Sequence, residues 1–146
     1  MSDSVWSAAG RLHVSGEARG PLVRTREPLS FWGGWDPATG EITDRRHPLS
    51  GVVGAGCVLA LPETRGSSTT TAVLLESIRR GTAPAALVTR GTDAFLSLAG
   101  IVAEELYGAG VLVLALSPED FDGMPEVGEG RISADGVLEI LPVESV

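Results

Sequence analysis

Short apolar segments alternate with glycine-rich turns along the chain, and two longer stretches show the spacing of amphipathic helices. In the first stretch, Thr71, Leu74 and Ile78 fall on one side of a helix. The stretch closes with two arginines, which suit the negative end of a helix dipole, and Gly81 follows as a favourable residue for ending the helix. The pattern therefore predicts a helix over residues 68–80.

A second helix is predicted after Thr92 and Asp93, because either residue can cap its first turn. Gly108 marks its end. Between these limits apolar residues recur at helical spacing, and we interpret the stripe that they form as the face that packs on the core. The stripe consists of Phe95, Leu98, Val102 and Leu106.

Three continuous apolar runs, at residues 56–61, 85–89 and 111–116, predict buried strands. The two helices separate these strands, which gives the order strand, helix, strand, helix, strand. This order is typical of a mixed α/β fold. The sequence shows no internal repeat and no linker, so residues 1–146 are expected to form a single domain.

Both ends of the chain predict further strands, which would give the domain a β-rich half. Residues 10–14 and 18–24 flank a Ser-Gly-Glu turn, which indicates a hairpin. Residues 130–141 read as a second hairpin around an Asp-Gly dipeptide. Residues 36–40 have the sequence Asp-Pro-Ala-Thr-Gly, which is typical of a turn.

The composition narrows the possible functions. The chain of 146 residues has a net charge of −8, with eleven arginines, no lysine and no basic stripe, which argues against a nucleic-acid partner. No apolar run is long enough to span a bilayer, and the N-terminus lacks the pattern of a secretory leader. A cytoplasmic protein that does not bind a membrane is therefore expected.

The residues that bind metals are few and scattered. Cys57 lies inside an apolar run and reads as a small buried side chain. His13 alternates with apolar residues and is expected on a strand surface, whereas His47 precedes a proline in a loop and is the better candidate for function. No Cys/His cluster has ligand spacing, so no metal or cofactor is expected to be bound by this chain alone.

The most informative segment is residues 62–71, where an apolar strand passes through a Pro/Gly turn into a row of Ser and Thr residues. A helix N-terminus leaves N–H groups unpaired and carries a partial positive charge, so Gly66, Ser67 and Ser68 suit an anionic ligand. Arg65 adds a full charge and donors that match a carboxylate. The same residues also suit an ordinary helix cap, but a cap needs only one hydroxyl. The surplus favours a functional site.

Two blocks, Gly-Gly-x-Asp-Pro and Arg-Gly-Ser, are specific when they occur together and in this order. With them, the chain resembles the small subunit, or swivelling domain, of the aconitase X family over nearly its whole length. The matching segments are residues 28–37, 47–49, 65–68, 80–86 and 103–108.

The resemblance implies a swivelling β/β/α fold that docks against a larger subunit. In the family, that large subunit carries an iron–sulfur cluster or an iron and most contacts to a small hydroxy-acid substrate. The small subunit contributes a serine, thought to act as the base in a dehydration, and Ser67 occupies the matching position. Arg65, Gly66 and Ser68 are then expected to bind substrate, although Arg65 can instead face Ser67 or the partner.

The resemblance leaves the reaction open. The family often has glycine where this chain has Thr64, and the Arg-Glu that follows Gly-Ser-Ser in true aconitases is absent, which argues against citrate as substrate. The lysine-free, Ala- and Arg-rich composition favours the bacterial reaction, dehydration of cis-3-hydroxy-L-proline. The alternatives are dehydration of mevalonate 5-phosphate and a non-catalytic binding or regulatory relative. An apolar surface for the partner is expected at Phe31, Trp32 and Trp35, and the alternative is that these aromatic residues close the core of the sheet.

Overall fold

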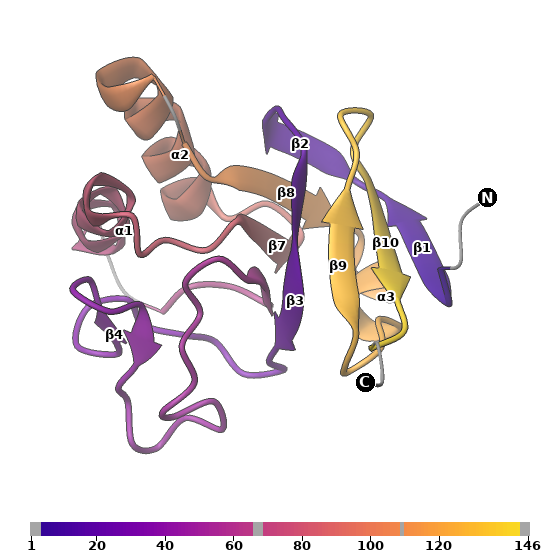
Figure 1. Ribbon diagram of the computed structural model, residues 1–146, viewed down its shortest axis with the longest axis horizontal. Helices are drawn as coiled ribbons and strands as arrows, with labels where there is room; N and C mark the ends of the chain where they lie inside the picture. Colours follow the sequence, from indigo (N-terminus) through magenta and orange to yellow (C-terminus); the bar gives the residue numbers. More distant parts are fainter. Residues whose placement is uncertain (1–3, 66–68, 109, 144–146) are drawn as a thin grey trace.

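The computed structural model describes residues 4–65, 69–108 and 110–143 (Figure 1). The chain forms a mixed α/β domain, as predicted. In chain order the elements are β1 (Trp6–Ala9), β2 (Arg11–Val14), β3 (Ala18–Arg24), β4 (Trp35–Asp36), β5 (Glu41–Ile42), β6 (Val58–Leu61), α1 (Thr69–Arg80), β7 (Ala86–Arg90), α2 (Ala94–Tyr107), β8 (Leu112–Leu116), α3 (Pro118–Asp122), β9 (Glu129–Ile132) and β10 (Val137–Leu141).

Within the described residues, eight strands form one sheet in the order β1-β10-β9-β3-β6-β7-β8-β2, and β4 and β5 form a separate ribbon. The four strands β3, β6, β7 and β8 are parallel to one another, and antiparallel strands extend the sheet at both ends. Residues of β6, β7 and β8 are almost all buried, since both faces of the parallel part are covered. Their continuous apolar runs thus predicted these strands correctly.

The sheet separates two apolar clusters. Successive side chains of a strand point to opposite faces, so Leu59 and Leu61 of β6 join one cluster while Val58 and Ala60 join the other. Helices α1 and α2 cover the first cluster, and the short helix α3 packs on the second through Phe121. No helix in the described residues is long and apolar enough to cross a membrane.

The predicted hairpin over residues 10–24 is wrong, whereas the C-terminal hairpin is confirmed. Strand β2 pairs with β8 at one edge of the parallel strands, and β3 pairs with β6 and β9. An alternating pattern identifies a strand but leaves its partner open when distant strands compete for pairing. Strands β9 and β10 do form a hairpin, and Gly136 takes the positive φ of 82° that its turn requires.

The predicted packing of α2 is also wrong, although its cap and its end are correct. Asp93 caps the helix and Gly108 ends it in the left-handed conformation. Three of the four residues of the predicted core stripe, however, face outward, and Val102 is half-buried. Leu98 and Leu106 are 51% and 64% exposed, and Phe95 is exposed as well. The buried side of α2 consists of Leu96 and four small residues, Ser97, Ala99, Gly100 and Ala103.

Small side chains allow α2 to lie very close to the sheet. A methyl group at Gly100 would lie 2.6 Å from Val14 Cγ2 and 3.2 Å from the carbonyl oxygen of Val111. The packing of α2 on the sheet therefore depends on close approach of the two backbones. A search of the sequence for large apolar residues does not detect this feature. The large apolar side chains of the stripe remain exposed on the outward side of α2.

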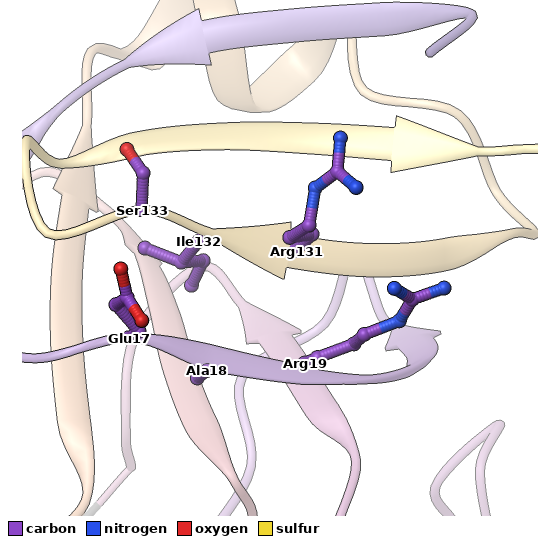
Figure 2. Close-up of a pocket in the computed structure, with 6 residues that line it drawn as sticks. All are labelled: Glu17, Ala18, Arg19, Arg131, Ile132 and Ser133. Atoms are coloured by element: carbon purple, nitrogen blue, oxygen red, sulfur yellow. The ribbon is translucent and has the colours of Figure 1, made fainter. Parts of the chain in front are cut away.

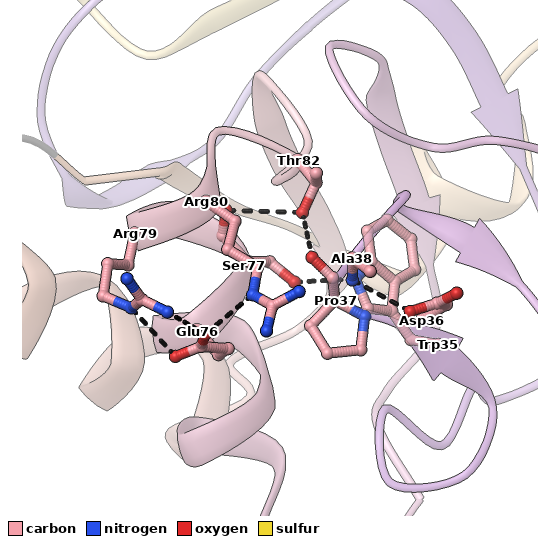
Figure 3. Close-up of polar contacts among 9 residues, drawn as sticks. All are labelled: Trp35, Asp36, Pro37, Ala38, Glu76, Ser77, Arg79, Arg80 and Thr82. Carbon is pink, nitrogen blue, oxygen red and sulfur yellow. Dashed lines mark hydrogen bonds and ion pairs between the residues drawn. The ribbon is translucent and has the colours of Figure 1, made fainter.

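The β4–β5 ribbon is fastened to the far end of α1 (Figure 3). Trp35 Nε1 donates a hydrogen bond of 2.8 Å to Ser77 Oγ, and Thr82 Oγ1 donates one of 2.7 Å to the carbonyl oxygen of Pro37. The predicted turn is confirmed, since Asp36 Oδ1 accepts from the N–H of Ala38. The Gly-Gly-x-Asp-Pro block thus anchors a loop to the helix that carries the motif at its other end.

The three aromatic residues expected at a partner surface differ in their exposure. Phe31 and Trp35 are buried, with ring centroids 5.2 Å apart, and they close the core beneath the ribbon. The expectation is wrong for these two residues. Trp32 is 68% exposed, so only this residue has the exposure that a partner surface requires.

Substitutions at the two adjacent glycines of this block are expected to differ in their effect on stability. A methyl group at Gly34 would lie 2.2 Å from the carbonyl oxygen of Ser30, so Gly34→Ala should lower the free energy of unfolding by roughly 2–3 kcal/mol. Gly33 has open space but a φ of 77°, which asparagine tolerates, so Gly33→Asn should cost under about 1 kcal/mol. Urea denaturation of both variants measures the difference. Equal losses would contradict the close-approach explanation.

Candidate functional site at the carboxyl edge of the parallel strands

The described residues on either side of the motif, 62–65 and 69–71, lie at the carboxyl edge of the parallel strands. Because these strands run in one direction, the segments that follow β3, β6 and β7 meet at the same edge of the sheet, where α/β proteins commonly bind ligands. Residues 62–65 leave β6 there, and α1 begins at Thr69. The catalytic candidate Ser67 and the binding candidates Gly66 and Ser68 lie outside the described residues, between Arg65 and the first turn of α1.

The entry to the motif is held by backbone pairing with the segment that follows β3. Leu29 and Thr64 form a parallel bridge, in which the N–H of Arg65 donates to the carbonyl oxygen of Leu29 over 3.0 Å. The N–H of Leu29 donates in turn to the carbonyl oxygen of Glu63 over 3.3 Å. Leu29 is fully buried in the core cluster beneath α1. The backbone before the motif is therefore fixed by the core.

Asp93 joins the motif to the start of α2. Its Oδ2 accepts hydrogen bonds from the N–H and the hydroxyl of Thr64, at 2.7 and 2.8 Å. Its Oδ1 accepts from the N–H groups of Phe95 and Leu96, both at 3.1 Å. A buried carboxylate is costly unless donors surround it, and here four donors share it. The sequence predicted the helix cap but not the bond to Thr64, which lies 29 residues away.

The first turn of α1 has a second link to α2. Thr71 Oγ1 donates to the carbonyl oxygen of Phe95 over 3.4 Å. Thr70 is buried, and its hydroxyl has no hydrogen-bond partner among the described residues. The threonine row therefore does more than continue the helix. It packs the start of α1 against α2.

Arg65 has the exposure expected of a binding residue. Its side chain is exposed, and within the described part of the chain its guanidinium makes no hydrogen bond or ion pair. Two nearby arginines behave differently, because Arg26 pairs with Glu126 and Arg90 with Asp122. The hydrogen bonds from Arg90 hold the pKa of the Asp122 carboxyl below its ordinary value. Among the described residues, the Arg65 guanidinium is thus available to an anionic group.

The candidate metal ligands do not come together. The described residues contain no group of three or more His, Cys, Asp or Glu side chains that could hold a metal ion. Burial raises the pKa of the Cys57 thiol, which makes it a poor ligand and nucleophile. His47 is buried with its Nδ1 accepting from the N–H of Leu49, which fixes the ring inside its loop. His13 Nε2 contacts Thr92 Oγ1 at 3.2 Å, beside Asp93.

A separate hollow of about 390 Å³ lies between β3 and β9, in the β-rich half of the molecule (Figure 2). Its two arginines are already paired, Arg19 with Glu129 and Arg131 with Glu139. Strands β3 and β9, whose residues line the hollow, lie away from α1 (Figure 1). It adds nothing to the chemistry at the carboxyl edge. Its lining residues are Glu17, Ala18, Arg19, Arg131, Ile132 and Ser133.

A sequence profile of the aconitase X swivel domain matches residues 7–140 of the chain. The chain belongs to the aconitase X swivel-domain family. The family resemblance and the fold predicted from it are thereby confirmed. The described architecture agrees with the crystal structure of Thermococcus kodakaraensis aconitase X in its holo-form, which superposes with a TM-score of 0.81 at 28% identity and covers 92% of this chain and 98% of that chain.

Two characterised relatives of this swivel domain differ in length. The chain is 47% identical over 130 residues to a cis-3-hydroxy-L-proline dehydratase of Pseudomonas aeruginosa, which covers 89% of this chain but only 22% of that protein. It is 35% identical over 126 residues to the phosphomevalonate dehydratase small subunit of Methanothermobacter thermautotrophicus, covering 86% of this chain and 92% of that subunit. The chain thus spans about a fifth of the first relative and nearly all of the second.

The hydrogen bonds that Asp93 accepts from Thr64 and from the first turn of α2 can be tested with a matched pair of variants. Asp93→Ala removes all four accepted bonds and should lower the free energy of unfolding by roughly 2–3 kcal/mol. Thr64→Val keeps the backbone bond and should cost only about 1 kcal/mol. Hydrogen exchange distinguishes the variants, because the Thr64 amide should exchange faster only in Asp93→Ala. Unchanged protection of that amide would show that Asp93 does not hold the motif.

Proposed function

We propose that this chain is the small subunit of a heteromeric aconitase X-type hydro-lyase in the cytoplasm and that Ser67 is the base of its dehydration reaction. The observation that carries the proposal is the Arg-Gly-Ser-Ser motif, which stands between β6 and α1 in the sequence of a chain of this family. The near-complete match to a stand-alone small subunit supports a separate large-subunit partner.

Dehydration requires a base on one side of the substrate and a leaving hydroxide on the other. Ser67 takes the proton from carbon, the electrons of the broken C–H bond form the double bond, and the C–O bond breaks as hydroxide leaves. An iron or iron–sulfur cluster in the large subunit would supply Lewis-acid chemistry to the leaving oxygen. The described residues of this chain offer no ligand group for it.

A serine hydroxyl is a weak base unless its alkoxide is stabilised. The sequence places Ser67 before the first turn of α1, where unpaired N–H groups and the helix dipole favour negative charge. Arg65 is exposed and able to add a full positive charge to the alkoxide or to a substrate carboxylate. Gly66 allows close backbone approach to the ligand, and Ser68 is suited to cap the helix.

We propose cis-3-hydroxy-L-proline as the substrate, because the identity to its dehydratase is 47% against 35% for the phosphomevalonate relative. Mevalonate 5-phosphate is the second candidate, since that relative is itself a small subunit. Assays of the reconstituted complex with each compound decide between them. Turnover of neither compound would favour a binding or regulatory relative with the same fold.

The isolated chain should fold, bind no iron and show no turnover, because its described part lacks a ligand cluster. Addition of the large subunit should bring both iron and dehydratase activity. Metal analysis and the assay, each with and without the large subunit, measure this. Stoichiometric iron in the isolated chain, or turnover without the partner, would contradict the division of labour.

Ser67→Ala should abolish turnover while leaving folding and complex formation nearly intact, because only the proton acceptor is removed. The comparison variant is Ser68→Ala, which should mainly lower stability, by roughly 1 kcal/mol, as the loss of a helix cap does.

Arg65→Lys should also impair turnover, since a point charge does not replace a bidentate guanidinium. The kcat and the denaturation midpoint of each complex are the measurements. Near wild-type kcat in Ser67→Ala would exclude Ser67 as the base.

A further inference from the structure

Helix α2 presents a continuous apolar face to the outside. Large apolar residues that are exposed singly are common on protein surfaces, but here they share one helix and repeat at helical spacing. We call these residues the α2 face. They are Phe95, Leu98, Ile101 and Leu106.

This exposure is built into the packing of α2. The opposite side of the helix is buried, and a methyl group at Gly100 would already clash with Val14. Asp93 fixes the rotation of the first turn through two N–H groups. Helix α2 therefore cannot turn its large side chains inward, and they stay exposed in the isolated chain.

The α2 face begins at the motif. The N–H of Phe95 is capped by the same carboxylate that holds Thr64, and the carbonyl oxygen of Phe95 accepts from Thr71 in the first turn of α1. A second protein chain that covers a substrate at the motif would therefore also contact the adjacent end of α2. The remaining residues of the face extend the same surface away from the motif along the helix.

Charge favours a different chain over a second copy. Beside the face, a hollow of about 190 Å³ is lined by His13, Ile101, Glu104 and Glu105, among others. Helix α2 contains no arginine or lysine. Two copies that met through this helix would add carboxylates to carboxylates, and the net charge of −8 would oppose them further. A partner with a basic side chain next to an apolar groove fits both features.

We infer that the α2 face is the docking surface for the large subunit, with Glu104 and Glu105 receiving a basic side chain of that subunit. The inference rests on the proposed function, because it takes the large subunit as the occupant. It adds the location of the interface: the large subunit contacts this chain along α2 as well as at the motif.

The test measures the affinity of the purified large subunit for the double variant Leu98→Ser/Leu106→Ser. Both side chains are exposed in the isolated chain, so the fold should persist, which circular dichroism checks. Truncation of each buried interface residue costs about tenfold in affinity, so the Kd should rise roughly 30- to 100-fold. At saturating large subunit, the kcat should stay near that of the unmodified complex. Val127→Ser, another exposed apolar residue on a different surface, is the matched control and should leave the Kd unchanged.

Each remaining outcome decides the inference. An unchanged Kd in the double variant, equal losses in the control, or failure of the unmodified chain to bind the large subunit would overturn it. Sedimentation of the isolated chain addresses the second copy: a dimer that the double variant breaks, with an unchanged Kd for the large subunit, would also overturn it. A complex that depends on α2 but dehydrates neither candidate substrate would support the docking surface and refute the proposed function.

Discussion

The buried carboxylate of Asp93 is the interaction on which the arrangement of the site depends. It is shared by the backbone and hydroxyl of Thr64 on one side and by the first N–H groups of α2 on the other. Two segments far apart in sequence therefore move as one unit. The contacts that hold α2 in place therefore also fix the path of the chain into the Arg-Gly-Ser motif. In this way the position of Arg65 depends on the packing of α2.

The second constraint is close backbone approach on the same side of the molecule. Gly100 brings α2 against the sheet, and Gly34 lets the β4–β5 ribbon close over the core beside α1. Trp35 then ties that ribbon to Ser77 in α1. Both helices that flank the motif are thus held at their buried sides by small residues and specific polar contacts. Their outward sides remain free to meet a partner.

Much of the fold could be predicted because its central elements are locally encoded. The apolar runs of β6, β7 and β8, the amphipathic pattern of α1 and the Asp-Gly turn of β9–β10 each carry their own signal. Strand β2 could not be assigned its partner, because pairing with β8 depends on residues about a hundred positions away. Large apolar residues at helical spacing predict the core side of a helix, and for α2 this prediction is wrong. That rule fails where small residues hold a helix close to the sheet.

The site was predictable in part. Arg65 lies exposed at the start of the motif, as expected of a binding residue, but sequence patterns alone fit either a helix cap or an anion site in this segment. The choice of Ser67 as base came from the family resemblance, and the family itself is confirmed by the profile match. The bond between Thr64 and Asp93 could not be foreseen, since no local pattern connects two residues that meet only through the fold.

The central claim is that the motif and α2 form one surface that the large subunit covers. Hydrogen–deuterium exchange of this chain, free and in complex with the large subunit, tests it most directly. The account predicts slower exchange in the complex at residues 62–71 and along α2, with the β9–β10 hairpin unchanged. Protection confined to the β9–β10 hairpin, with α2 and the motif as exposed as in the free chain, would contradict it.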